Sequence, residues 1–224
     1  MLLGGLLRRS ARRYPQKAAL ISGAARHSFG ELDGRANSLA NALLAGGVRA
    51  GDRVAILADN CSEYAEVLVA AARGGFVVVP LSCRLEPEDL AYMINNSEAG
   101  TLFLGANYWQ VINSLQPRLE SVRRFIVFGD ASGERGSYEG LIRAHPAEKP
   151  RVEVAEGDLY CIAYTSGTTG LPKGVMLSHR NIISALTDGA ITFGLTRDDV
   201  MAVYHPLFHI SSIWSLWLGL YVGA

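Results

Sequence analysis

The sequence has three cysteines, no excess of charge of either sign, and no C-x-x-C pair. The wide spacing of Cys61, Cys83 and Cys161 argues against a zinc site or a disulfide framework. This cysteine usage favours a location of the protein in the reducing cytoplasm. The 21 basic and 21 acidic residues cancel, and this balance argues against nucleic acid as a main partner. The chain is long enough for a sizeable hydrophobic core, so the composition indicates a globular protein.

Acidic residues are missing from residues 1–30, where arginines are frequent. That bias is typical of a transit peptide, but the leucines and arginines of residues 2–13 alternate as in a short amphipathic helix. We favour the helix, and we leave open whether it touches a membrane surface. The apolar run 210–224 is shorter than the roughly 20 residues that a membrane-spanning helix needs, and it contains serines, so we expect a buried helix and no integral membrane span.

Short apolar runs alternate with helical patterns along most of the chain. Buried strands are expected at 53–58, 76–80, 101–104, 124–128 and 159–163, with a further strand at 199–204. Helices are expected between them, which predicts an α/β fold with a mostly parallel, doubly wound sheet flanked by helices. The glycine- and proline-rich stretch 129–157 is the best candidate for a boundary between two sub-sheets.

The most informative stretch is residues 164–174, with the sequence Tyr-Thr-Ser-Gly-Thr-Thr-Gly-Leu-Pro-Lys-Gly. Its glycines let the backbone N–H groups approach an oxyanion, and its hydroxyls add further donors. Lys173 adds a positive charge, and no acidic residue occurs between Leu159 and Thr187. A Walker P-loop is excluded because Gly174 follows the lysine where a Ser or Thr would stand. The expected unit is therefore strand, phosphate-binding loop, strand.

This stretch resembles the phosphate-binding loop of the adenylate-forming superfamily, which includes acyl-CoA synthetases, luciferase-like enzymes and the adenylation domains of peptide synthetases. Further likeness runs through Gly51-Asp52-Arg53 and Val79-Pro80-Leu81. The resemblance covers the amino-terminal portion of such enzymes, so it implies that residues 1–224 are a truncated amino-terminal part of their large domain.

The resemblance implies activation of a carboxylic acid by ATP and Mg²⁺, followed by capture of the acyl-adenylate by CoA. The residues that it implies for binding the ATP phosphates are Thr165, Ser166, Gly167, Thr168, Thr169, Gly170 and Lys173. Phe208 and His209 match the motif that lines the carboxylate pocket. For His179 and Arg180, directly after the loop, we favour a solvated helix start over a phosphate-binding role.

Several motifs of the superfamily have no counterpart in the 224 residues, among them the Tyr-Gly-x-Thr-Glu motif and the catalytic lysine. We therefore expect no adenylation by this chain alone, and we assign it no catalytic residue and no metal ligand. Two alternatives stay open, a non-catalytic nucleotide- or protein-binding module and a nucleoside triphosphatase with an unusual loop. The apolar residues around Phe208 favour a fatty or aryl acid as substrate. An oligomer is compatible with the sequence.

Overall fold

The structure is a computed structural model that describes residues 1–129, 137–165 and 170–224. Within these residues a six-stranded sheet has the order β6-β5-β3-β4-β7-β8, and all of its neighbouring strands pair in parallel except β7 and β8. The strands are β3 (Arg53–Leu57), β4 (Val77–Pro80), β5 (Thr101–Gly105), β6 (Arg124–Phe128), β7 (Leu159–Thr165) and β8 (Lys173–Ser178). A separate hairpin consists of β1 (Ala18–Ser22) and β2 (Ala25–Ser28).

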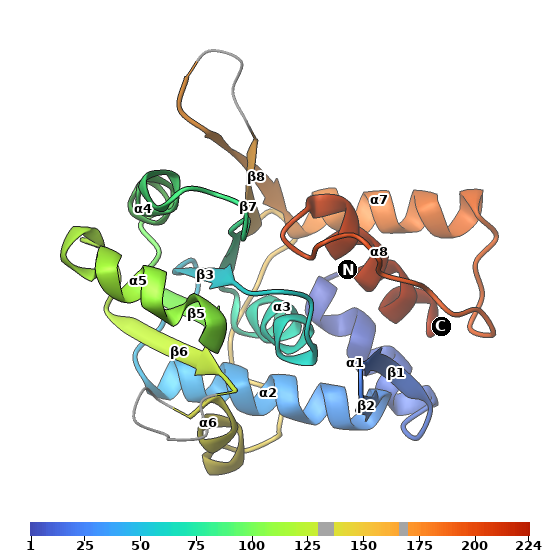
Figure 1. The fold of residues 1–224 in the computed structure, drawn as a ribbon. Helices are drawn as coiled ribbons and strands as arrows, with labels where there is room; N and C mark the ends of the chain where they lie inside the picture. Colours follow the sequence, from blue (N-terminus) through green and yellow to red (C-terminus); the bar gives the residue numbers. More distant parts are fainter. Residues whose placement is uncertain (130–136, 166–169) are drawn as a thin grey trace.

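Helices cover both faces of the sheet (Figure 1). One face carries α1 (Leu3–Arg13), α2 (Phe29–Ala45), α3 (Ser62–Gly74), α7 (His179–Thr192) and α8 (Ile210–Val222). The other face carries α4 (Pro87–Asn96) and α5 (Trp109–Leu115), which short 3-10 turns flank at Ala106–Tyr108 and Gln116–Arg118. The remaining helix, α6 (Tyr138–Ala144), packs on α2. This arrangement confirms the predicted doubly wound α/β fold.

The central strands β3, β4 and β5 are mainly apolar because both faces of the sheet are buried there, whereas the edge strand β8 is largely exposed. In β3, Val54 and Ile56 belong to the core under α2 and α3, whereas Ala55 and Leu57 belong to the core under α4 and α5. The two-residue period of a strand sends successive side chains to opposite faces, so one short apolar run supplies both cores.

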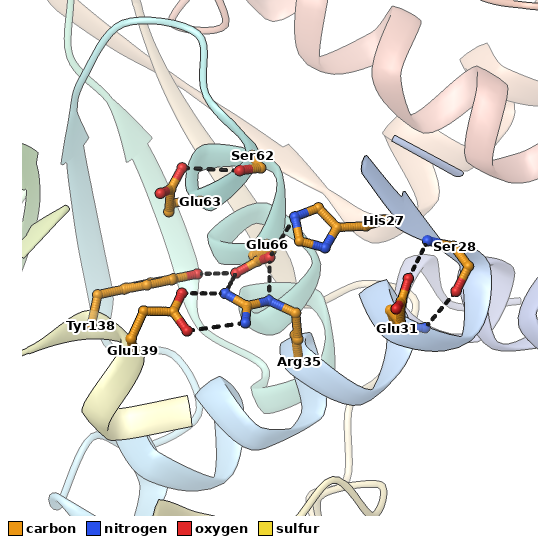
Figure 2. A network of polar contacts seen from close by, with 9 residues as sticks. All are labelled: His27, Ser28, Glu31, Arg35, Ser62, Glu63, Glu66, Tyr138 and Glu139. Atoms are coloured by element: carbon orange, nitrogen blue, oxygen red, sulfur yellow. Dashed lines mark hydrogen bonds and ion pairs between the residues drawn. The ribbon is translucent and has the colours of Figure 1, made fainter. Parts of the chain in front are cut away.

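Helix α3 is buried along almost its whole length, and it carries a buried carboxylate, Glu66. Figure 2 shows how three elements satisfy this charge. Arg35 of α2 donates to Glu66 from Nε at 2.6 Å and from Nη2 at 3.1 Å, and the Tyr138 hydroxyl of α6 donates to Oε2 at 2.6 Å. Arg35 also binds Glu139. The pairing offsets the large cost of burying a charge and joins α2, α3 and α6.

One predicted element is wrong. Residues 199–204 form no strand, although their side chains alternate between partly buried and exposed. Val200 is 91% exposed and Tyr204 is 81% exposed, while Met201 and Val203 pack against the core. Among the described residues no strand pairs with this segment, so the alternation has no ladder of hydrogen bonds to complete it. The proposed boundary at 129–157 stays a prediction, and part of it lies outside the described residues.

Candidate functional site

The candidate phosphate-binding loop is held between β7 and β8, which form an antiparallel hairpin that projects from the body of the molecule (Figure 1). The pair nearest the loop is Thr165 opposite Lys173, and the Thr165 hydroxyl lies 3.4 Å from the Lys173 carbonyl oxygen. This geometry confirms the strand, loop, strand order predicted from the sequence. It also fixes the two ends of the loop side by side.

The loop end of the hairpin is anchored to α4. The Tyr164 hydroxyl donates to Asn96 Oδ1 at 2.6 Å and lies 3.3 Å from the Met93 carbonyl oxygen. Opposite Tyr164, a Cβ on Gly174 would lie 2.7 Å from Ile162 Cγ2, so the close packing of the two strands favours glycine there. These contacts fix the position of the two strands next to the loop.

The structure describes only part of the predicted phosphate-binding set. Thr165 ends β7, Lys173 begins β8, and Gly170 adopts a φ of +130°, a conformation that side chains rarely allow. The other members lie outside the described residues: Ser166, Gly167, Thr168 and Thr169. Binding of phosphate by any of the seven stays a prediction.

The electrostatics at the hairpin suit an anion. Lys173 is exposed, and within the described part of the chain no carboxylate forms an ion pair with it. Arg180, in the first turn of α7, is also exposed, and its nearest carboxylate oxygen, on Glu156, is 3.9 Å away. An ammonium group without a carboxylate partner remains available to a phosphate.

His179 corrects the prediction of a solvated helix start, which holds for Arg180 but is wrong for the histidine. The His179 ring is buried and lies 5.3 Å from the Tyr160 ring, and the Tyr160 hydroxyl accepts a hydrogen bond from Trp217. Burial lowers the pKa of His179 to about 4, so the ring is neutral at pH 7. Neither ring nitrogen has a partner among the described residues. A phosphate-binding role is therefore not indicated for it.

The second predicted motif, Phe208-His209, begins helix α8. His209 is the N-cap residue and is exposed, and its ring lies 4.6 Å from that of Phe208. Phe208 is half-buried and lines a groove of about 350 Å³. The other residues of the groove are Asp59, Asn60, Cys83, Arg84, Tyr108, Tyr204 and Pro206. His209 is not among them, so its role in the acid pocket stays a prediction.

The groove and the loop lie at the same edge of the sheet. Asp59 and Asn60 follow β3, Cys83 and Arg84 follow β4, and the loop follows β7. Because β3, β4 and β7 are parallel neighbours, their carboxyl ends meet at one edge, which is where open α/β sheets bind ligands. Sequence reasoning missed the groove residues that precede Phe208, although Asp59 and Asn60 follow directly on the predicted strand 53–58.

The described residues contain no group of three or more His, Cys, Asp or Glu side chains that could hold a metal ion. The three cysteines are free thiols, as the sequence predicts, and burial raises the pKa of Cys161 to about 12. Cys83 lines the groove, and partial burial raises the pKa of its thiol as well. Neither thiol is therefore activated as a nucleophile.

The sequence profile of a family described as AMP-binding enzyme matches residues 7–224, nearly the whole chain. The chain belongs to the AMP-binding enzyme family. This assignment agrees with the geometry, since a glycine- and hydroxyl-rich loop lies at the ligand-binding edge of a doubly wound sheet.

Several curated AMP-binding relatives are CoA ligases by name. The long-chain-fatty-acid–CoA ligase FadD13 of Mycobacterium tuberculosis is 30% identical over 215 residues, which cover 94% of this chain and 42% of the relative. A long-chain-fatty-acid–CoA ligase of Thermus thermophilus is 34% identical, with 85% of this chain and 35% of the relative covered. A feruloyl-CoA synthase of an Amycolatopsis species is 34% identical, with 94% and 40% covered. The chain thus spans about two fifths of these relatives.

Solved structures show the same fold. An inhibitor-bound amino-terminal domain of FACL13 from M. tuberculosis superposes with a TM-score of 0.92 at 29% identity, covering 99% of this chain and 55% of that one. The anthranilate CoA ligase AuaEII in complex with anthranoyl-AMP superposes with a TM-score of 0.95 at 25% identity, covering 100% and 44%. The described fold is therefore that of the amino-terminal part of adenylate-forming enzymes.

Proposed function

We propose that this chain provides the ATP-binding part of an enzyme that activates a carboxylic acid as an acyl-adenylate and transfers the acyl group to CoA. The observation that carries the proposal is the hairpin of β7 and β8, which closes the loop between Thr165 and Lys173 at the ligand-binding edge of the sheet. Membership of the AMP-binding enzyme family supports it.

The chemistry requires two anions to meet. A carboxylate oxygen attacks the α-phosphorus of ATP, the P–O bond to the leaving group breaks, and pyrophosphate departs. Backbone N–H groups and hydroxyls of the loop would hold the β- and γ-phosphates, and Lys173 would neutralise part of their charge. Holding the triphosphate in line with the acid lowers the entropic part of the barrier. We propose Mg²⁺ as part of the MgATP substrate, bound through phosphate oxygens and water.

The acid is proposed to be fatty or aromatic. Pro206 and Phe208 give the groove an apolar part, although Asp59 and Arg84 add charge to it. An amino-acid substrate would favour a carboxylate directly after this motif in the sequence to hold its ammonium group, whereas Ser211 and Ser212 stand there. The names of the relatives, which include fatty-acid and feruloyl substrates, support the same classes.

Residues 1–224 are proposed to be inactive in isolation. They correspond to about two fifths of the relatives, and the motifs of the superfamily that supply the catalytic lysine and the ribose-binding aspartate are not found in this sequence. The alternative is a non-catalytic binding module that keeps the nucleotide loop. Both hypotheses predict that the protein binds nucleotide. Only the first predicts that a longer product of the gene activates an acid.

A cytoplasmic location is proposed, with ATP, CoA and a small acid as partners. Among the helices of the described residues, none combines the length and apolarity that a bilayer crossing requires. The apolar face of α1, with Leu3, Leu6 and Leu7, is buried in the protein core. Only the arginine-bearing face of this helix could therefore meet a membrane surface.

Exchange of labelled pyrophosphate into ATP tests the function. The longest product of the gene should exchange only when a fatty or aryl acid is added, for which dodecanoate and benzoate are suitable probes. Residues 1–224 alone should show no exchange. Release of phosphate without any acid would support a triphosphatase instead, and nucleotide binding without exchange in the longest product would support the binding module.

A further inference from the structure

The turn after β3 ties a distant segment to the sheet through one side chain. Asn60 Nδ2 donates to the His205 carbonyl oxygen at 2.9 Å, and Asn60 Oδ1 accepts from the Leu207 backbone N–H at 2.7 Å. The partners lie 145 and 147 residues further along the chain. A single amide thus holds the backbone on both sides of Pro206.

The segment held in this way carries the predicted acid-binding motif. Leu207 is buried, Phe208 lines the groove, and His209 begins α8. The segment also closes a turn of its own, in which the His209 N–H donates to the Pro206 carbonyl oxygen at 3.0 Å. Since no strand of the described residues pairs with 199–207, the place of this turn on the sheet depends on side-chain contacts.

The neighbouring residue, Asp59, fixes another part of the groove. Its Oδ1 accepts from the Tyr108 hydroxyl at 2.9 Å, and its Oδ2 accepts from Asn107 Nδ2 at 3.1 Å. Tyr108 and Phe208 both line the groove of about 350 Å³. Asp59 and Asn60, which follow β3, therefore position groove residues from the 3-10 turn after β5 and from the segment before α8.

We propose that Asn60 is a positioning residue for the acid pocket: it holds Phe208 and His209 at the carboxyl edge of the sheet without touching ATP. This inference rests on the proposed function. Because the pocket wall is held in place from a buried strand, less conformational entropy is lost when the acid binds. The ATP loop is anchored separately, by Tyr164 on α4, so loss of the Asn60 hydrogen bonds should affect the acid more than the nucleotide.

The first test measures the hydrogen bonds themselves in residues 1–224. Asn60→Ala removes the acceptor for the Leu207 N–H, and amide hydrogen exchange at Leu207 should become about tenfold faster. Asn60→Asp keeps an acceptor for Leu207 and loses the donor to His205, so it should retain most of the protection. Asn41→Ala is the matched control, because Asn41 also donates to two distant carbonyl oxygens, those of Pro146 and Glu148.

The second test measures kinetics of pyrophosphate exchange in the longest product of the gene. Asn60→Ala should raise KM for dodecanoate or benzoate about tenfold and leave KM for ATP within about twofold, whereas Asn41→Ala should change neither. Asn60→Asp should give an intermediate KM for the acid.

Four results would overturn the proposal. An unchanged rate of amide hydrogen exchange at Leu207 in Asn60→Ala would show that the hydrogen bonds of Asn60 do not hold the segment. Asn60 would have only a general structural role if hydrogen exchange at Leu207 became faster while KM for the acid stayed unchanged. The same would follow if KM for the acid and KM for ATP rose equally. A wild-type protein with a protected Leu207 and no pyrophosphate exchange would remove the proposed function, and the positioning role with it.

Discussion

Replacing Tyr138 by Phe tests whether the buried charge of Glu66 depends on all of its partners. The Tyr138 hydroxyl donates to Glu66 Oε2 at 2.6 Å (Figure 2), and the Glu66 side chain is 0% exposed. The aromatic ring of Tyr138 packs against Phe103 and Phe128. Phenylalanine keeps the ring and removes only the donor. A hydrogen bond to a charged group contributes about 1.5–3 kcal/mol, so the variant should lose about 2 kcal/mol.

The loss should appear as a fall in Tm of about 4–8 °C, since a domain of this size shifts by about 2–4 °C per kcal/mol. Urea titration of residues 1–224 measures the free energy directly, and an unchanged m-value would show that only stability has changed. Tyr108→Phe is the control, because its hydroxyl also donates to a carboxylate, that of Asp59, which is exposed. Equal losses in the two variants would refute the reasoning that burial makes the Glu66 contact strong.

Two further predictions concern pH and the loop. Because burial lowers the pKa of His179 from 6.5 to about 4, its contribution to stability should be complete above pH 6.5 and fall as the pH drops toward 4. Between pH 7.5 and pH 5, the free energy of unfolding measured by urea titration should fall by about 2 kcal/mol more in the wild type than in His179→Gln. An equal fall in the two proteins would contradict this. Gly170→Ala should weaken ATP binding several-fold and also lower Tm, since a side chain strains the backbone at a φ of +130°, whereas Gly157→Ala should change neither.

Local features of the sequence were sufficient to predict much of the structure. Ser28 caps α2 with Glu31 in a capping box, and Ser178 caps α7, as short-range patterns indicate. The order of strand, loop and strand around Lys173 follows from apolar runs on both sides of a glycine- and hydroxyl-rich stretch. These features depend on neighbours in the sequence, which is why they could be predicted.

The features that could not be predicted depend on distant partners. His179 stands in a polar sequence beside Arg180, but Tyr160 covers it in the fold. Residues 200–204 are a short apolar run of the kind that predicts a strand, but they find no partner strand in the described part of the chain. Asn60 looks like an ordinary turn residue, and its hydrogen bonds to His205 and Leu207 span most of the chain. No local pattern carries that information.

The dissociation constant for ATP in a Lys173→Met variant tests the central claim most directly. Lys149→Met serves as the control, because Lys149 is also exposed and lies far from the hairpin in the sequence. Calorimetric titration of the longest product of the gene should show an affinity for ATP lowered about ten- to hundredfold in Lys173→Met and unchanged in Lys149→Met. Equal ATP affinity in the wild type and both variants would contradict the assignment of the 165–173 loop as the phosphate-binding element.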